Sequence, residues 1–142
     1  MSTLNSIPFT AAGNLTADPE LRFTGTGRPV TGLRIAVTPR RFDRDTNRYV
    51  DGTTTFVDGQ VWGEQAEHLA ESLHKGDRVL VIGRCVTRLF TPSQGPNVGV
   101  EQRRLEVVVD EIGPSLAWAT AVVTKTGITA DPASAEANIA AG

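Results

Sequence analysis

Only one stretch of this 142-residue chain has the spacing of a helix, and this limits the folds that it can form. In residues 64–74, Ala66, Leu69, Ala70 and Leu73 recur at helical intervals. The rest divides into short segments, separated by turn residues, in which apolar and polar residues alternate or β-branched residues dominate. Short antiparallel strands around a single helix favour a small closed or nearly closed β-barrel.

The order of these segments narrows the prediction to a mainly β protein with an OB-fold, a five-stranded Greek-key barrel whose helix lies between its third and fourth strands. The predicted strands are residues 7–12, 20–24, 30–38, 54–62, 78–90 and 103–109. The polar, arginine-rich residues 40–53 are predicted to form a hairpin, with Asp51-Gly52 as a turn signal. Gly76 is expected to end the helix at the position after its C-cap.

Three regions are predicted along the chain: a barrel domain over residues 1–115, an extension strand over 116–128 and a flexible tail over 129–142. The extension is apolar and alternates, so we expect it to clamp a neighbouring subunit, and folding back onto its own barrel is the alternative. The N-terminus does not resemble a signal peptide, and no apolar run approaches the ~20 residues of a membrane span. We therefore expect a cytoplasmic protein with no membrane partner.

Charge is distributed unevenly, although the formal net charge is only −2. Residues 22–48 carry seven arginines against two aspartates, a net charge of +5, and residues 84–104 carry a net charge of +3. Between them, residues 51–77 have a net charge of −5. If the two basic segments meet on one surface, that surface can hold a chain of phosphates, and a mixed solvated surface is the alternative. The arginines predicted to contact phosphate are Arg22, Arg34, Arg40, Arg41, Arg44, Arg88, Arg103 and Arg104.

The few aromatic residues are placed where they can stack on bases. Phe42 and Tyr49 lie in the polar hairpin, where no core requires them, and Phe90 ends a strand in the second basic segment. Phe56 and Trp62 are six residues apart on one predicted strand, so they share a face that is either core or binding surface. Flat rings beside cations suit single-stranded nucleic acid. The predicted stacking residues are Phe42, Tyr49, Phe56, Trp62 and Phe90.

No residues have the spacing of a catalytic or metal-binding motif. His68 and His74 are six residues apart on the helix and do not share a face, and the single cysteine, Cys85, offers no paired ligand. We expect Cys85 to be a buried small side chain, with an intermolecular disulfide as the alternative. Residues 43–47 resemble the opening of a calcium loop, lack its later ligands, and are interpreted as a turn. The sequence predicts no metal, no cofactor and no enzymatic activity.

Several motifs resemble, in order, those of the bacterial single-stranded-DNA-binding protein family over residues 7–114. They are GNL at 13–15, DPELRF at 18–23, LRIAV at 33–37, VWGEQAE at 61–67 and LHKGDRV at 73–79. The run EVVVDEIGPSL at 106–116 resembles the form found in high-GC Gram-positive bacteria. The resemblance implies a homotetramer that binds single-stranded DNA with little sequence preference, at the nucleoid, in replication, repair or recombination.

The resemblance also assigns roles to individual positions. Members of the family stack bases on aromatic residues in the long hairpin, in the strand before the helix and at the tip of the next hairpin. These positions are held here by Phe42, Phe56, Trp62 and Phe90. Arg22 and Arg88 fall at basic positions of the family, whereas Val86 and Leu89 stand where relatives often have a cation. The resemblance therefore implies a weaker grip on phosphate at that wall.

The chain departs from the family at its C-terminus. The family ends in a flexible linker and a short acidic tip that recruits other replication and repair proteins, whereas this sequence ends in EANIAAG at 136–142. The resemblance thus implies a specialised paralogue that does not recruit partners through such a tip. Two further hypotheses fit an OB-fold: a protein–protein assembly module, and a nuclease that would use Asp43 and Asp45.

Overall fold

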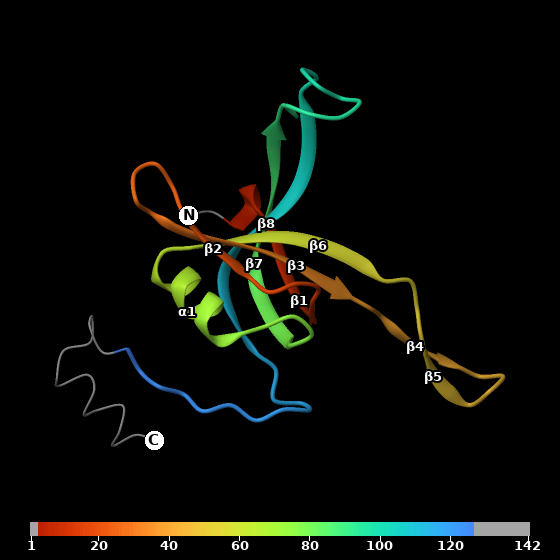
Figure 1. The fold of residues 1–142 in the computed structure, drawn as a ribbon. Coiled ribbons are helices and arrows are strands. Elements are labelled where there is room, and N and C mark those ends of the chain that lie inside the picture. The colour runs from red at the N-terminus through yellow and green to blue at the C-terminus, as the bar shows by residue number, and fades with distance from the viewer. Residues whose placement is uncertain (1–2, 127–142) are drawn as a thin grey trace.

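The computed structural model describes residues 3–126, which form one barrel, one α-helix and two projecting hairpins (Figure 1). The elements in order are a short 3₁₀-helix (Thr3–Asn5), β1 (Ile7–Leu15), β2 (Glu20–Phe23), β3 (Pro29–Val37), β4 (Arg40–Asp43), β5 (Arg48–Asp51), β6 (Thr55–Trp62), α1 (Glu64–Ser72), β7 (Arg78–Phe90) and β8 (Gln102–Pro114). No helix in this described part is long and apolar enough to cross a membrane.

Five strands close into a ring. The main sheet has the order β1-β7-β8-β6-β3-β2, and β1 pairs with β3 as well as β7, so only β2 stands outside the ring. All pairings are antiparallel except that of β6 with β8, which is parallel at Gly59↔Val107 and Gln60↔Val108. Helix α1 lies between the third and fourth strands of the ring, β6 and β7. The predicted OB-fold is confirmed.

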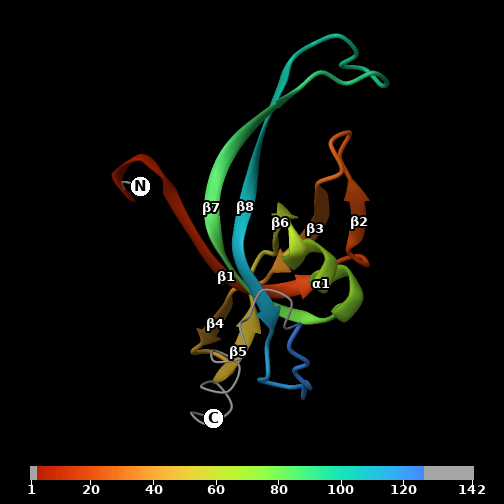
Figure 2. The same ribbon diagram turned by 90° about the vertical axis from the view of Figure 1, so that its left-hand side faces the viewer.

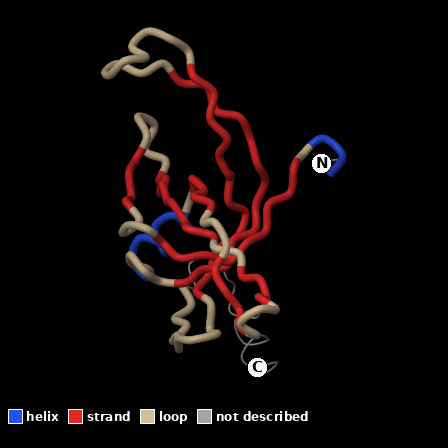
Figure 3. The backbone as a smooth tube through the Cα atoms, turned by 90° about the vertical axis from the view of Figure 1, so that its right-hand side faces the viewer, coloured by secondary structure: helices blue, strands red, loops and turns tan. Residues whose placement is uncertain are grey.

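Two hairpins extend away from the barrel. Strands β4 and β5 continue the ribbon of β3 and β6, and the hydroxyls of Thr38 and Thr54 hydrogen-bond at 2.7 Å where the two ribbons join. The outer halves of β7 and β8 form a longer arm on another side of the barrel (Figure 2). Figure 3 shows that the loop at the end of this arm lies far from the barrel's body. The β4–β5 hairpin carries residues of the first basic segment, and the β7–β8 arm carries residues of the second.

The inward side chains form one apolar core. Its buried members are Leu15, Leu33, Ile35, Val61, Ala66, Leu69, Leu73, Val79, Val81, Val107 and Val109. Alternation in the strands turns these residues inward, and helical spacing places Ala66 and Leu69 against the barrel. The buried hydroxyl of Thr31 donates to the carbonyl of Ala66 at 2.8 Å and fixes α1 on β3. Cys85 packs against this core but is only half-buried, rather than buried as predicted.

A bulge in β8 lets the barrel close. The pairing of β7 with β8 shifts between Ile82 and Gly83, and a Cβ atom at Gly83 would overlap the carbonyl oxygen of Val108. Only glycine permits so close an approach of two backbones. The shift leaves Asp110 without a partner residue on β7. Its backbone carbonyl therefore needs a partner from elsewhere.

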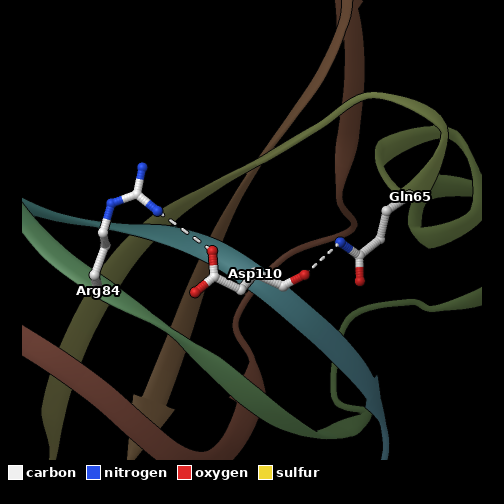
Figure 4. A network of polar contacts seen from close by, with 3 residues as sticks. All are labelled: Gln65, Arg84 and Asp110. Carbon is white, nitrogen blue, oxygen red and sulfur yellow. Dashed lines mark hydrogen bonds and ion pairs between the residues drawn. The ribbon is translucent and has the colours of Figure 1, made fainter. Parts of the chain in front are cut away.

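That partner is the side chain of Gln65 at the start of α1 (Figure 4). Its amide donates to the carbonyl of Asp110 at 3.1 Å, and its oxygen accepts the N–H of Ile112 at 3.1 Å. The carboxylate of Asp110 accepts from Arg84 on β7 at 3.3 Å. One glutamine side chain thus replaces a neighbouring strand beside the bulge.

The helix ends earlier than predicted. It stops at Ser72, because Leu73 adopts an extended conformation and His74 donates its N–H to the Asp77 carboxylate at 2.8 Å. Gly76 does have a positive φ of 91°, but it lies in the turn after the helix and donates to the carbonyl of Leu15 at 2.8 Å. The prediction that Gly76 ends the helix is wrong, because this turn is set by contacts with β1.

The turn of the β4–β5 hairpin lies at residues 43–47, as interpreted from the sequence, and not at Asp51-Gly52, where a turn was also predicted. Asp43 accepts hydrogen bonds from the N–H of Asp45 and the hydroxyl of Thr46, and Asn47 has a φ of 56°. Residues 43–47 are therefore the turn between β4 and β5, as interpreted from the sequence. Gly52 instead donates to the carbonyl of Pro39 at 2.7 Å at the base of the hairpin, so Asp51-Gly52 is not its turn.

Residues 116–126 do not form the predicted extension strand. The end of β8 pairs with β7 up to Pro114, and Gln65 occupies the other side of β8, so this end of the sheet offers no free edge. The rest of the predicted strand and the predicted tail lie outside the described residues.

The segment 116–126 lies against its own barrel. The guanidinium of Arg78 lies 4.9 Å from the centre of the Trp118 ring, and the hydroxyl of Thr126 hydrogen-bonds to Nε2 of His68 at 3.3 Å. A cavity of about 610 Å³ separates the segment from the end of the barrel. Trp118 remains 76% exposed, so its packing in the single chain is incomplete.

We predict that Gln65→Ala lowers the free energy of unfolding by about 1–3 kcal/mol, because it leaves a carbonyl and an N–H beside the bulge without partners. Chemical denaturation measures this loss. Glu64→Ala is the matched control, because Glu64 is an exposed residue of the same turn of α1. Equal stability of the two variants would show that water satisfies the bulge and that Gln65 is not needed.

Candidate nucleic-acid interface

The outer face of β6 carries the two aromatic residues whose orientation the sequence left open. Val61 points into the core and is fully buried, so Trp62 and the other residues of its parity, including Phe56, point outward. Phe56 is 54% exposed and Trp62 is half-buried. Both rings therefore belong to the outer surface of the barrel.

Each of these rings lies beside an arginine of the neighbouring strand or turn. The guanidinium carbon of Arg28 is 4.6 Å from the centre of the Trp62 ring, and that of Arg34 is 4.9 Å from the centre of the Phe56 ring. Antiparallel pairing produces this arrangement, because Val30 lies opposite Trp62 and Ala36 opposite Phe56. A cation over a ring is attracted by the negative π face. The pairs place flat apolar surface and positive charge together.

A hollow of about 200 Å³ lies beside Trp62. It is lined by Arg22, Phe23, Thr24, Val30, Gln60, Trp62 and Arg88. Arg22 comes from β2 and Arg88 from β7, so the first and second basic segments do meet on one surface here. Phe23 is 59% exposed at the edge of the hollow, which gives it a second aromatic wall.

The β7–β8 arm carries a further ring and cation on one of its faces. The guanidinium carbon of Arg104 lies 4.8 Å from the centre of the Phe90 ring, and Arg88 lies directly opposite Arg104. Arg88 also pairs with the mostly buried carboxylate of Glu106 at 3.4 Å. Arg103 lies next to Arg104 in the strand and so points to the opposite face. The structure therefore groups Arg88 and Arg104 with Phe90 and separates Arg103 from them.

The β4–β5 hairpin carries the remaining two predicted rings. Phe42 and Tyr49 lie opposite each other, with ring centres 5.3 Å apart in an edge-to-face contact. Arg40 lies 5.9 Å from the centre of the Tyr49 ring and 3.6 Å from the carboxylate of Asp51. Arg41 lies one residue away from Arg40 in β4 and points to the other face of the hairpin.

The comparison with the predicted site is therefore mixed. All five predicted aromatic residues lie on the outer surface or on the two arms, and the sequence prediction missed three contributors: Phe23, Arg28 and Gln60. Phe23 was detectable, because it follows Arg22 in a predicted strand. Gln60 was also detectable, because it lies two residues before Trp62 in the same predicted strand and so shares its face. Arg28 was not, because its place beside Trp62 depends on how β3 pairs with β6. Arg44 lies in the hairpin turn, at the tip.

The described residues contain no group of three or more His, Cys, Asp or Glu side chains that could hold a metal ion. Both oxygens of the Asp43 carboxylate accept hydrogen bonds within the hairpin turn. The side chain of Asp43 therefore stabilises the turn at the end of an exposed hairpin, and Asp45 lies within that turn.

A small closed barrel whose outer face carries aromatic rings beside arginines has the architecture of OB-fold proteins that bind single strands. The family described as the single-strand binding protein family matches residues 8–115. The chain therefore belongs to this family, and the resemblance found in its motifs is confirmed.

Individual relatives agree with this assignment. A single-stranded DNA-binding protein from Paenarthrobacter aurescens is 50% identical over 118 residues, covering 83% of this chain and 67% of that protein. One from Mycolicibacterium smegmatis is 50% identical over 117 residues, covering 82% and 68%. The crystal structure of a small single-stranded DNA-binding protein from Streptomyces coelicolor matches with a TM-score of 0.65 and 30% identity, covering 80% of this chain and 97% of that one. The relatives confirm the high-GC Gram-positive type.

Proposed function

We propose that this protein binds single-stranded DNA by stacking bases on its exposed rings and pairing phosphates with its arginines, and that it catalyses no reaction. The observation that carries this proposal is the pairing of exposed or half-buried rings with arginines on one strand face and on both arms. A base supplies a π face and the strand supplies charge, so each ring–arginine pair offers both kinds of contact to one nucleotide.

The same pairs suggest how a strand is accepted. In the free protein the guanidinium groups lie over the rings of Trp62 and Phe56, where a base would stack. An incoming base takes the place of the guanidinium on the ring, and the displaced guanidinium then reaches the adjoining phosphate. The exchange keeps the ring covered and converts a cation–π contact into a charge-assisted hydrogen bond.

Binding of this kind selects single strands over duplex DNA, because paired and stacked bases cannot offer their faces to the rings. It reads little sequence, since every base has a π face. A protein with this role protects single strands during replication, repair or recombination, and it would act in the cytoplasm at the nucleoid. The nuclease alternative is disfavoured, because Asp43 is occupied by hydrogen bonds within its own turn.

A second exposed surface supports assembly into a homotetramer. On the outer face of β7, Leu80 and Ile82 are 52% and 50% exposed, and they lie opposite Ala12 and Thr10 of β1. Exposed apolar side chains on the face of a sheet favour contacts between proteins. This surface carries none of the ring–arginine pairs, so subunits can associate through it and leave the rings open. An assembly module that binds only other proteins would not need those pairs.

We predict that poly-dT quenches tryptophan emission, mainly through Trp62, and that duplex DNA of equal length quenches far less. Trp62→Ala should weaken binding by about 1–3 kcal/mol, the usual cost of losing one stacked base. A fluorescence titration measures the quenching, and anisotropy of a labelled strand measures the affinity. Trp118→Phe is the control, because Trp118 lies on the C-terminal segment, and it should keep both quenching and affinity. Unchanged affinity in folded Trp62→Ala would remove Trp62 from the site.

We predict that affinity falls as salt rises, with a slope of about −0.7 in log K against log salt for each phosphate neutralised on a single strand. Arg22→Ala should flatten this slope by about one such contact, and Arg40→Ala together with Arg41→Ala should also flatten it. Lys125→Ala removes one positive charge from the C-terminal segment and should leave the slope unchanged. Binding that is indifferent to salt would exclude a phosphate track.

We predict that truncation after Ser115 loosens the assembly, because we propose that residues 116–128 clamp a neighbouring subunit. The expected result is a species of lower mass on dilution in analytical ultracentrifugation, with a lower melting temperature. Truncation after Thr126 is the control, because it keeps the contact of Trp118 with Arg78. If truncation after Ser115 lowers only the melting temperature, the segment stabilises its own barrel, and the clamp is excluded.

A further inference from the structure

The stretch of β6 between its two outward rings carries polar side chains. Phe56, Asp58, Gln60 and Trp62 share the outer face, and the two rings lie about 20 Å apart along the strand at the usual rise of about 3.3 Å per residue. A single strand that stacks on both rings must therefore pass over Asp58 and Gln60. The charge and hydrogen-bonding groups of these two residues decide whether the bases or the phosphates of the strand face β6 between the rings.

The carboxylate of Asp58 makes no hydrogen bond or ion pair with another side chain or with the backbone among the residues that the structure describes. Arg34 lies directly opposite Asp58 on β3, but its guanidinium lies over the Phe56 ring, 4.9 Å from the ring centre. Opposite Gln60 stands Gly32, and a Cβ atom there would meet nothing within 4 Å. A half-buried carboxylate thus borders an open patch of the binding face.

A carboxylate in this position acts differently on phosphates and on bases. It repels the phosphates, which the arginines on either side attract, so the strand passes with its base edges toward β6. Unpaired bases expose their Watson–Crick edges. Cytosine presents an amino donor at N4, which a carboxylate accepts, whereas thymine presents the acceptor O4 at the same place. The charged oxygen of Asp58 attracts the N4 amino group of cytosine and repels O4 of thymine, so it favours cytosine where this corner of the base faces Asp58.

We propose that Asp58 is a specificity-determining residue that makes this surface favour cytosine over thymine at the position between the two rings. The inference rests on the proposed binding of single-stranded DNA, and adds a local base preference to it. Gln60 carries both a donor and an acceptor, so it accommodates either base and does not oppose the preference.

The test compares oligo-dC with oligo-dT of equal length, under conditions in which neither strand folds on itself. Anisotropy of labelled strands gives the ratio of the two dissociation constants, Kd for dT over Kd for dC. In Asp58→Asn this ratio should fall by about tenfold, the order of one charge-assisted hydrogen bond. The amide of asparagine can donate to O4 of thymine or accept from N4 of cytosine, so it removes the discrimination and keeps the size of the side chain.

Asp45→Asn is the matched control, because it removes the same charge from the exposed hairpin turn. It should change the affinity for both strands by the same factor and leave the ratio unchanged. If both strands bind but Asp58→Asn leaves the ratio unchanged, Asp58 acts only as a charge or as an ion-pair partner of Arg34, and the base preference is overturned. If neither strand binds the unaltered protein, the proposed function itself has failed.

Discussion

Closure of the barrel depends on a short parallel contact between β6 and β8, and most other features of the molecule follow from it. Strand β8 leaves the regular ladder of β7 at the bulge in order to reach β6, and this requires the backbone approach that only Gly83 permits. The carbonyl released at the bulge is satisfied by Gln65 from α1. The helix is therefore part of the barrel's hydrogen-bonding system as well as a cover for its core.

In a closed barrel, alternate side chains of each strand point into the core and out to the surface. Inward residues such as Ile35 and Val61 are fully buried, and the outward residues between them form a continuous surface. On β3 and β6 this surface carries the rings of Phe56 and Trp62 with their arginines, whereas on β1 and β7 it carries exposed apolar residues. One alternation thus gives the barrel two surfaces of different chemistry.

Local charge matters more here than total charge. The chain has a formal net charge of −2, yet the hollow beside Trp62 has Arg22 from one basic segment and Arg88 from the other on its walls. Much of the acidic segment lies on α1, where Glu64, Glu67 and Glu71 are exposed. Asp58 and Asp51 are exceptions, because β6 and β5 bring these carboxylates into the candidate interface. The positive surface is a product of folding, which sorts a nearly neutral chain by face.

The sequence by itself determined the strands, the single helix and the order that defines an OB-fold, because side-chain periodicity and turn residues act locally. It also indicated the aromatic residues of the candidate interface. Only the tertiary structure decided that Phe56 faces outward, that Arg28 covers Trp62 and that Arg88 lies opposite Arg104. It also decided that residues 116–126 are not a strand, since β8 has no free edge left there. These outcomes depend on register and pairing between distant segments, which local pattern does not specify.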